Sequence, residues 1–118
     1  KYTDIRNYKK LNKIIKAFKP QIIFHLAAQP IIFQSYLDPV STININSVGT
    51  LNLIDISKNL ESLKSVVCVT SDKCYANNFS TKGFKETDQL GGADPYSASK
   101  ASAEIIVNAY KESYFKKK

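Results

Sequence analysis

The stretch SVVCVTSDKCY, residues 65–75, joins an apolar run to a group of polar side chains that follows it at once. The run at 66–68 is typical of a short strand that is buried on both faces of a sheet. Ser71, Asp72 and Lys73 come where that strand is expected to end. Because burying a charge without a partner costs free energy, this group predicts either a turn into solvent or a chemical site.

A second apolar run, QIIFHLA at 21–27, predicts another strand of the same kind. Before it, apolar residues recur at i, i+3, i+4 and i+7 over 11–18, which indicates an amphipathic helix that ends at Lys19, just before a proline. Between the two runs, we expect a loop with two prolines at 28–39. A helix is expected at 40–60, where apolar residues again follow helical spacing.

The region after the second run begins with turn-forming residues and continues into a helix. Three of the four glycines fall within 72–94, which we expect to be a long irregular loop that carries function. Asp94 and Pro95 fit the N-cap and first residue of a helix that runs to about Phe115. The order of helix, strand, helix, strand, helix predicts an α/β fold with right-handed crossovers and a parallel sheet, in one domain or part of one.

The composition is that of an ordinary globular chain, with 118 residues, 43% of them apolar and 23% charged. No apolar run approaches the roughly 20 residues that cross a membrane, and the polar N-terminus does not have the pattern of a signal peptide. Cys68 and Cys74 have neither the spacing of a disulfide framework nor neighbouring metal ligands. These features predict a cytoplasmic protein with reduced cysteines and no metal.

The net charge of +7 raises nucleic acid as a partner. However, 16 of the 17 basic residues are Lys and only Arg6 is Arg. The side chains that form bidentate hydrogen bonds to bases or phosphates are mostly Arg. The lysines of the first helix lie opposite its apolar stripe and fit a solvated face. We therefore expect no nucleic-acid binding, although a basic binding module remains an alternative class.

A second polar group, DPYSASKASAE at 94–104, places Tyr96 and Lys100 four residues apart on one helix face. A nearby ammonium favours the phenolate and lowers the pKa of a tyrosine, so such a pair suits a general base. The alternative is an ordinary pair on a solvated face. Ligands of parallel sheets bind beyond the carboxyl ends of the strands. Asp72 and Lys73 follow such an end, so we expect them at the ligand site.

The motifs HLAAQP, N-x-x-GT at 46–50, VTSDKCY and DPYSASKA follow one another in an order and spacing that cover nearly the whole chain. In these motifs the chain resembles the extended short-chain dehydrogenase/reductase family, and within it the CDP-glucose 4,6-dehydratases. The resemblance implies a Rossmann-type doubly wound parallel sheet and bound NAD. It also implies that residues 1–118 are the central part of the NAD-binding domain, without the glycine-rich unit before it and the substrate-binding part after it.

The resemblance assigns five catalytic residues. Tyr96 takes the proton from the sugar 4-hydroxyl, and Lys100 holds the nicotinamide ribose. Ser71 hydrogen-bonds the same 4-hydroxyl, and Asp72 protonates the 6-hydroxyl as water leaves. Lys73 stands where the related dTDP-glucose enzymes carry a Glu that removes the C5 proton. Since an ammonium beside a carboxylate favours the charged carboxylate, the division of acid and base roles between Asp72 and Lys73 stays open.

The resemblance also assigns cofactor contacts. Asp4 and Ile5 match the segment beside the adenine ring, and Tyr96 and Lys100 contact the nicotinamide end. Four residues of the HLAAQ segment lie near the NAD pyrophosphate and ribose: Leu26, Ala27, Ala28 and Gln29.

The implied activity is conversion of CDP-glucose to CDP-4-dehydro-6-deoxyglucose and water, in a homodimer built through the long helices. A nucleotide-sugar epimerase or reductase of the same family is the alternative, and epimerases usually carry a small residue where Asp72 stands. His25 and Asn46 fit structural roles. On its own, the polypeptide 1–118 is expected to be inactive and to bind NAD weakly.

Overall fold

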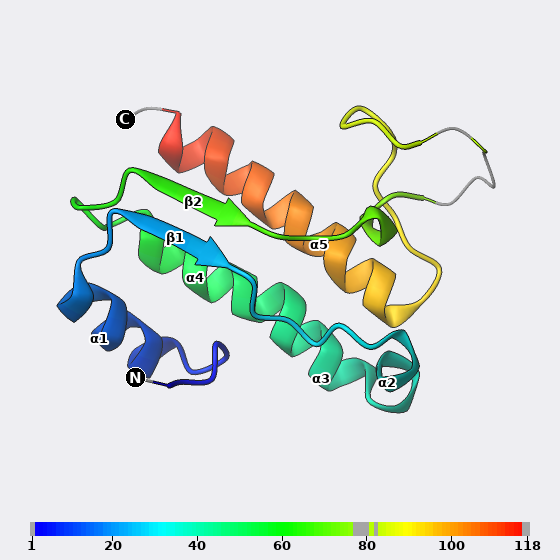
Figure 1. Cartoon of the computed structure of the whole chain (residues 1–118), viewed down its shortest axis with the longest axis horizontal. Coiled ribbons are helices and arrows are strands. Elements are labelled where there is room, and N and C mark those ends of the chain that lie inside the picture. Colours follow the sequence, from blue (N-terminus) through cyan, green and yellow to red (C-terminus); the bar gives the residue numbers. More distant parts are fainter. Residues whose placement is uncertain (1, 77–80, 82, 117–118) are drawn as a thin grey trace.

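The computed structural model describes residues 2–76, 81 and 83–116 of the chain. Two parallel strands, β1 and β2, lie side by side with Ile22 opposite Ser65 and His25 opposite Cys68. Figure 1 shows them in front of α4 and α5, with α1 beside α4. The elements in chain order are α1 (Tyr8–Phe18), β1 (Ile22–His25), α2 (Ile32–Leu37), α3 (Pro39–Ile43), α4 (Gly49–Ser57), β2 (Ser65–Cys68) and α5 (Pro95–Tyr110).

Helix α1 has the amphipathic form that its spacing predicts. Asn7 caps it, since its side-chain oxygen accepts a hydrogen bond from the Lys10 backbone N–H at 3.0 Å. The helix ends at Lys19, whose φ of 51° is left-handed and whose N–H bonds to the Ile15 carbonyl. The apolar stripe of α1 packs on α4 and forms the main core cluster: Leu11, Ile15, Leu53, Ile56 and Leu60.

The sheet is parallel as predicted, but the prediction that both strands are buried on both faces is wrong for the described residues. Side chains alternate along a strand, so His25 points towards the helices and is 6% exposed, whereas Phe24 points the other way and is 66% exposed. Val67 on β2 is likewise exposed. The reason is that the helices of the described part cover one face of the sheet.

The predicted helix at 40–60 is found as two α-helices joined by a π-helical turn. α3 (Pro39–Ile43) leads into the turn Asn44–Val48 and then into α4 (Gly49–Ser57) without a break in the helical path. Asp38 caps this helix, because its side chain accepts a hydrogen bond from the Ser41 N–H at 3.0 Å. The turn widens the helix at the point where it passes α5.

The prediction of a loop at 28–39 is wrong in part, because α2 (Ile32–Leu37) lies within it. The Ser35 hydroxyl donates to the Ile32 carbonyl at 2.7 Å and Asp38 ends the helix. Most of the apolar side chains of α2, such as Phe33 and Leu37, are exposed. The helix therefore has no buried stripe that the sequence pattern could reveal.

The last helix agrees with the sequence prediction. Asp94 is the N-cap, and its carboxylate accepts from the Ser97 N–H at 2.9 Å and from the Ser97 hydroxyl at 2.6 Å. Helix α5 continues through the π-helical turn Lys111–Phe115. Before it, the chain from β2 forms a short 3-10 turn, Asp72–Cys74, and an isolated antiparallel bridge between Tyr75 and Leu90.

None of the helices in the described part of the chain combines the length and the apolar character that a membrane crossing requires.

Candidate active site

The polar group after β2 forms a tight turn. The Ser71 hydroxyl accepts a hydrogen bond from the Lys73 N–H at 3.2 Å and donates to the Asp72 carboxylate at 3.0 Å. The Ser71 carbonyl accepts from the Cys74 N–H at 3.0 Å. Ser71 is half-buried, while Asp72 and Lys73 are exposed, so the turn presents one hydroxyl, one carboxylate and one ammonium at the end of the strand.

Asp72 and Lys73 do not form the charge pair that their adjacency suggested. Three ion pairs occur within residues 2–76, 81 and 83–116, and none of them joins these two side chains. Neighbouring residues in a helical turn point in different directions, which leaves the carboxylate and the ammonium available to separate parts of a ligand.

Tyr96 and Lys100 lie in the first two turns of α5, and each is only 7% exposed. The Lys100 ammonium lies 6.0 Å from the centre of the Tyr96 ring. Burial lowers the pKa of Lys100 below its usual range. The alternative of an ordinary pair on a solvated face is therefore wrong, because both side chains are packed inside the structure.

The turn and the helix meet at the carboxyl end of β2, as the rule for parallel sheets predicts. The Thr70 hydroxyl donates to the Glu104 carboxylate on α5. Burial acts to raise the pKa of Asp94, but hydrogen bonds from Ser97 and the charge of Lys73 outweigh it and hold the pKa below its usual range. The turn Asp72–Cys74 packs against α5.

The segment after β1 is held by Asn46, which is 2% exposed and lies in the π-helical turn. The Asn46 side-chain oxygen accepts from the Gln29 N–H at 2.8 Å, and its amide donates to the Gln29 carbonyl at 3.0 Å and to the Ser99 hydroxyl at 2.9 Å. One side chain thus ties the HLAAQ segment to α5. Of that segment, Leu26 and Ala27 are exposed, while Ala28 and Gln29 are half-buried.

His25 is buried and makes one side-chain hydrogen bond, between its Nε2 and the Thr50 hydroxyl at 2.9 Å. The Thr50 hydroxyl donates its only proton to the Asn46 carbonyl at 2.6 Å, so the His25 Nε2 must be the donor. Burial, and then the charge of Lys100, lower the pKa of His25. His25 is therefore a neutral histidine, consistent with the structural role expected from the sequence.

Ile5 lies beside the first turn of α4, and Asp4 precedes it in the chain. Arg6 forms a two-oxygen ion pair with Asp4, whose closest distance is 2.6 Å, and the hydrogen bonds from Arg6 lower the pKa of Asp4 to about 2. The Asn52 amide donates to the Ile5 carbonyl at 3.1 Å. A Cβ on Gly49 would come within 2.6 Å of the Ile5 side chain, so this glycine allows Ile5 to sit close to the helix.

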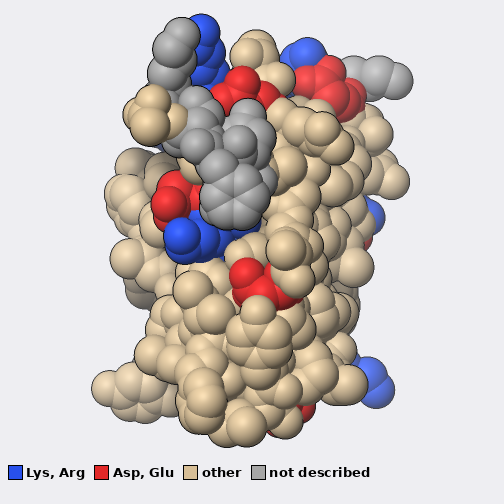
Figure 2. Space-filling view, turned by 90° about the vertical axis from the view of Figure 1, so that its right-hand side faces the viewer, with Lys and Arg blue, Asp and Glu red and all other residues tan. Residues whose placement is uncertain are grey.

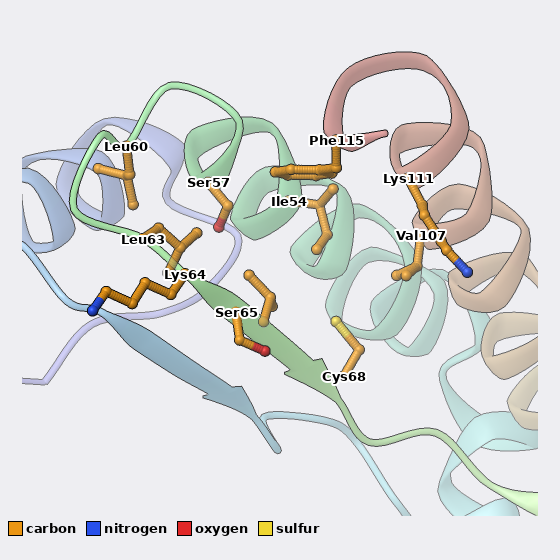
Figure 3. A pocket seen from close by; sticks show the side chains of 11 residues that line it. Ile54, Ser57, Leu60, Leu63, Lys64, Ser65, Cys68, Val107, Lys111 and Phe115 are labelled. Carbon is orange, nitrogen blue, oxygen red and sulfur yellow. The ribbon is translucent and has the colours of Figure 1, made fainter. Parts of the chain in front are cut away.

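A pocket of about 440 Å³ lies elsewhere, between α4, β2 and the C-terminal half of α5 (Figure 3). Ile54, Cys68 and Val107 are among the side chains that line it. Ser71, Tyr96 and Lys100 do not line it. This hollow is thus separate from the candidate site.

Figure 2 shows the end of the molecule that carries the polar turn and α2. Charged side chains gather in its upper half, and the lower half, over α2, is largely uncharged. The exposed apolar residues of α2 include Phe33 and Tyr36. The exposed Phe33 side chain has neither a charge nor a hydrogen-bond donor to offer a phosphate. Within the described residues, no three His, Cys, Asp or Glu side chains gather as a metal site would require.

The parallel strands, the crossover helices and the polar groups at the carboxyl ends of the strands are those of a Rossmann-type fold. A solved dTDP-glucose 4,6-dehydratase from Streptomyces venezuelae with NAD and TYD bound superposes with a TM-score of 0.85 and 26% identity, over 96% of this chain and 34% of that one. A UDP-glucose 4-epimerase from Thermotoga maritima shares the fold, with a TM-score of 0.87 at 24% identity, over 96% of this chain and 37% of that one.

The family model described as GDP-mannose 4,6 dehydratase matches residues 1–116, and the chain belongs to that family. The chain is 45% identical over 112 residues to the CDP-glucose 4,6-dehydratase of Salmonella typhimurium, covering 95% of this chain and 31% of that protein. It is 29% identical to a UDP-glucose 4-epimerase of Mycoplasma genitalium, over 92% and 32%. The resemblance and the fold inferred from the motifs are thus confirmed, and the chain spans about a third of the length of these relatives.

Proposed function

We propose that residues 1–118 are the central part of the NAD-binding domain of a longer enzyme, an NAD-dependent CDP-glucose 4,6-dehydratase. The observation that carries the proposal is that the turn after β2, with Ser71, Asp72 and Lys73, packs against α5, the helix that carries the buried pair of Tyr96 and Lys100. The 45% identity to a CDP-glucose 4,6-dehydratase supports the choice of substrate.

The residues at the site suit NAD. Lys100 is a buried ammonium without an ion-pair partner among the described residues, and ribose hydroxyls would supply the acceptors it needs. The small side chains of Ala27 and Ala28 allow a close approach of pyrophosphate and ribose, with Leu26 and Gln29 beside them. Asp4 and Ile5 would face the adenine.

The oxidation at the sugar C4 involves three residues of this chain. When bound, NAD accepts a hydride from the sugar and later returns it. Tyr96 removes the proton of the sugar 4-hydroxyl, acting as a general base. Lys100 holds the ribose, and its ammonium lies 6.0 Å from the centre of the Tyr96 ring. The Ser71 hydroxyl, already oriented by its bonds within the turn, binds the same 4-hydroxyl.

The elimination rests on the other two residues of the turn. A ketone at C4 acidifies the C5 proton, so water can leave across C5 and C6. Asp72 is the group that protonates the departing 6-hydroxyl, and Lys73 lies near C5. Their separate orientations support different roles at neighbouring carbons, and the product is a 4-keto-6-deoxy sugar nucleotide.

A nucleotide-sugar epimerase is the second candidate, since two UDP-glucose 4-epimerases match this chain at 29% and 32% identity. Asp72 argues for the dehydratase, because an epimerase expels no water and needs no acid at C6. The test is to incubate the full-length protein with CDP-glucose and to measure base-labile 4-keto product.

We expect that product from the parent protein and a loss of about 10²-fold or more in its rate for Asp72→Asn, the range of general acid catalysis. Interconversion of UDP-glucose and UDP-galactose with no 4-keto product would favour the epimerase. An unchanged rate for Asp72→Asn would remove the acid from the proposal.

We also propose that the enzyme is a homodimer built through α5 and its neighbours. The exposure of Ile105 and Tyr114 on this helical layer supports an apolar contact there. Light scattering on the full-length protein measures the mass directly, and a monomer at micromolar concentration would contradict the proposal.

A further inference from the structure

The two halves of the candidate site are far apart in sequence. Ser71 lies at the end of β2 and Tyr96 lies in α5, with the long loop between them. A loop of this length does not by itself set the distance between its ends. Something in the packed structure must fix the polar turn relative to the tyrosine, because misplacement by about 1 Å can cost on the order of 10²-fold in rate.

The hydrogen bond from the Thr70 hydroxyl to the Glu104 carboxylate is placed to do this. Thr70 directly precedes Ser71, and the preceding Val69 N–H still bonds to the His25 carbonyl on β1 at 3.0 Å. Val69 is thus hydrogen-bonded to β1, and Thr70 is the residue between Val69 and the catalytic turn. A hydrogen bond from this position to Glu104 holds α5 at a fixed distance from the sheet.

Glu104 lies on the same ridge of α5 as the catalytic pair. Tyr96, Lys100 and Glu104 are spaced i, i+4 and i+8, which is one of the rows that side chains form along a helix. Glu104 is half-buried. Fixing Glu104 to the strand end therefore fixes the rotation of the helix that presents Tyr96 and Lys100.

The surroundings show that the carboxylate faces the strand rather than solvent. Burial, and then the charge of Glu104, raise the pKa of both Cys68 in β2 and Cys74 in the turn. The hydrogen bond from Thr70 holds the carboxylate beside the segment that joins β2 to the turn. A charge in this half-buried position needs hydrogen-bond donors, and the Thr70 hydroxyl is one.

We propose that Thr70 and Glu104 are positioning residues that set the distance between the turn Ser71–Lys73 and Tyr96. The proposal rests on the dehydratase function for its kinetic consequence, but the anchoring itself is a property of the fold. Two measurements on the full-length protein test the anchoring and its kinetic consequence separately.

The first measurement is hydrogen exchange at the backbone amides of Lys73, Cys74 and Tyr75, which bond within the turn. Thr70→Val removes the hydroxyl at nearly constant shape and is expected to speed exchange there by about tenfold or more, whereas Thr70→Ser keeps it near the parent rate. Unchanged exchange in Thr70→Val overturns the proposal whatever the enzyme does. If the parent protein converts no nucleotide sugar, the proposed function fails, and this measurement still decides the anchoring.

The second measurement is steady-state kinetics with CDP-glucose. Thr70→Val and Glu104→Ala are each expected to lower kcat by 10- to 100-fold with KM within about twofold, and the double variant to be no worse than the poorer single variant, because the two groups act as one unit. Glu112→Ala is the matched control, since Glu112 is an exposed carboxylate in the π-helical turn that follows α5 and is paired with Lys116, and the kcat of this variant should stay at the parent value. Additive losses, or an unchanged kcat in Thr70→Val, overturn the positioning role.

Discussion

At the scale of single residues, burial shifts the protonation of two ionisable side chains of the described structure. Lys100 and His25 are both buried, and burial lowers the pKa of each. The charge of Lys100 also disfavours a proton on His25, which lowers the pKa of His25 further. A neutral His25 therefore avoids placing a second positive charge beside the ammonium that we assign to the ribose.

This arrangement predicts a pH dependence of stability that originates at His25. The pKa of His25 in the folded protein lies below the usual histidine value of 6.5, so below about pH 6.5 the unfolded chain takes up a proton that the folded protein resists. The unfolding free energy therefore falls on acidification, by at most about 1.4 kcal/mol per pH unit from this group. Denaturation of the full-length protein between pH 5 and 7.5 measures it.

His25→Gln is the control, because the glutamine amide retains a donor for Thr50 and does not titrate. We expect a shallower loss of stability on acidification in this variant than in the parent protein. Parallel pH profiles for the two proteins would contradict the assignment.

At the scale of elements, the sequence pattern predicts a helix that buries one face in the core. It misses a helix that has no buried face. The stripe that includes Leu11 and Ile15 predicts α1, because those residues pack into the core. The apolar residues of α2 point mostly to solvent, so no periodicity marks that helix.

The π-helical turn Asn44–Val48 also cannot be recognised from the apolar pattern, yet its side chains hold α5 in place. The extra residue in the turn lets neighbouring side chains face α5 together: Asn46 bonds to the Ser99 hydroxyl and Ser47 to the Ser99 carbonyl and the Ser102 hydroxyl. The place of Ser71–Lys73 and Tyr96 could be predicted, since parallel strands end at one edge. Glu104 could not, because its partner Thr70 is an ordinary strand residue in sequence.

The entry into α5 depends on a close approach at Gly92. A Cβ on this residue would lie 2.5 Å from the Ser97 carbonyl carbon and 2.6 Å from the Ala98 nitrogen. These are backbone atoms of the helix, so the chain before Tyr96 must shift. We expect Gly92→Ala to cost about 1–3 kcal/mol, as overpacking does, and to lower kcat by on the order of 10²-fold.

Gly91 provides the matched control. A Cβ on Gly91 would lie 3.5 Å from the Ala76 Cβ, which is an ordinary contact. Gly91→Ala should therefore change stability by no more than about 0.5 kcal/mol and leave kcat near the parent value. Equal effects of the two substitutions, in denaturation and in turnover, would contradict this account.

At the scale of the whole molecule, one face of the sheet is apolar and exposed in the described residues. Ile22, Phe24 and Leu26 alternate with the side chains that face the helices, and Val67 and Val69 continue the same face on β2. An apolar face of this kind is typical of a surface that another part of a protein covers. It fits the proposal that the chain is the central portion of a larger domain.

The last prediction concerns cofactor binding by the polypeptide 1–118 itself. The four glycines at 49, 83, 91 and 92 do not form the G-x-x-G-x-x-G pattern whose backbone N–H groups cradle a pyrophosphate. Each charge-assisted hydrogen bond to the phosphates contributes about 1.5–3 kcal/mol, so losing one or two weakens binding by on the order of 10²-fold. Isothermal titration should find this difference between the polypeptide and the full-length protein, with circular dichroism confirming that the polypeptide retains its helices. Binding of NAD to folded 1–118 as tight as to the full-length protein would show that the residues near Lys100, Ala28 and Asp4 suffice without such a cradle.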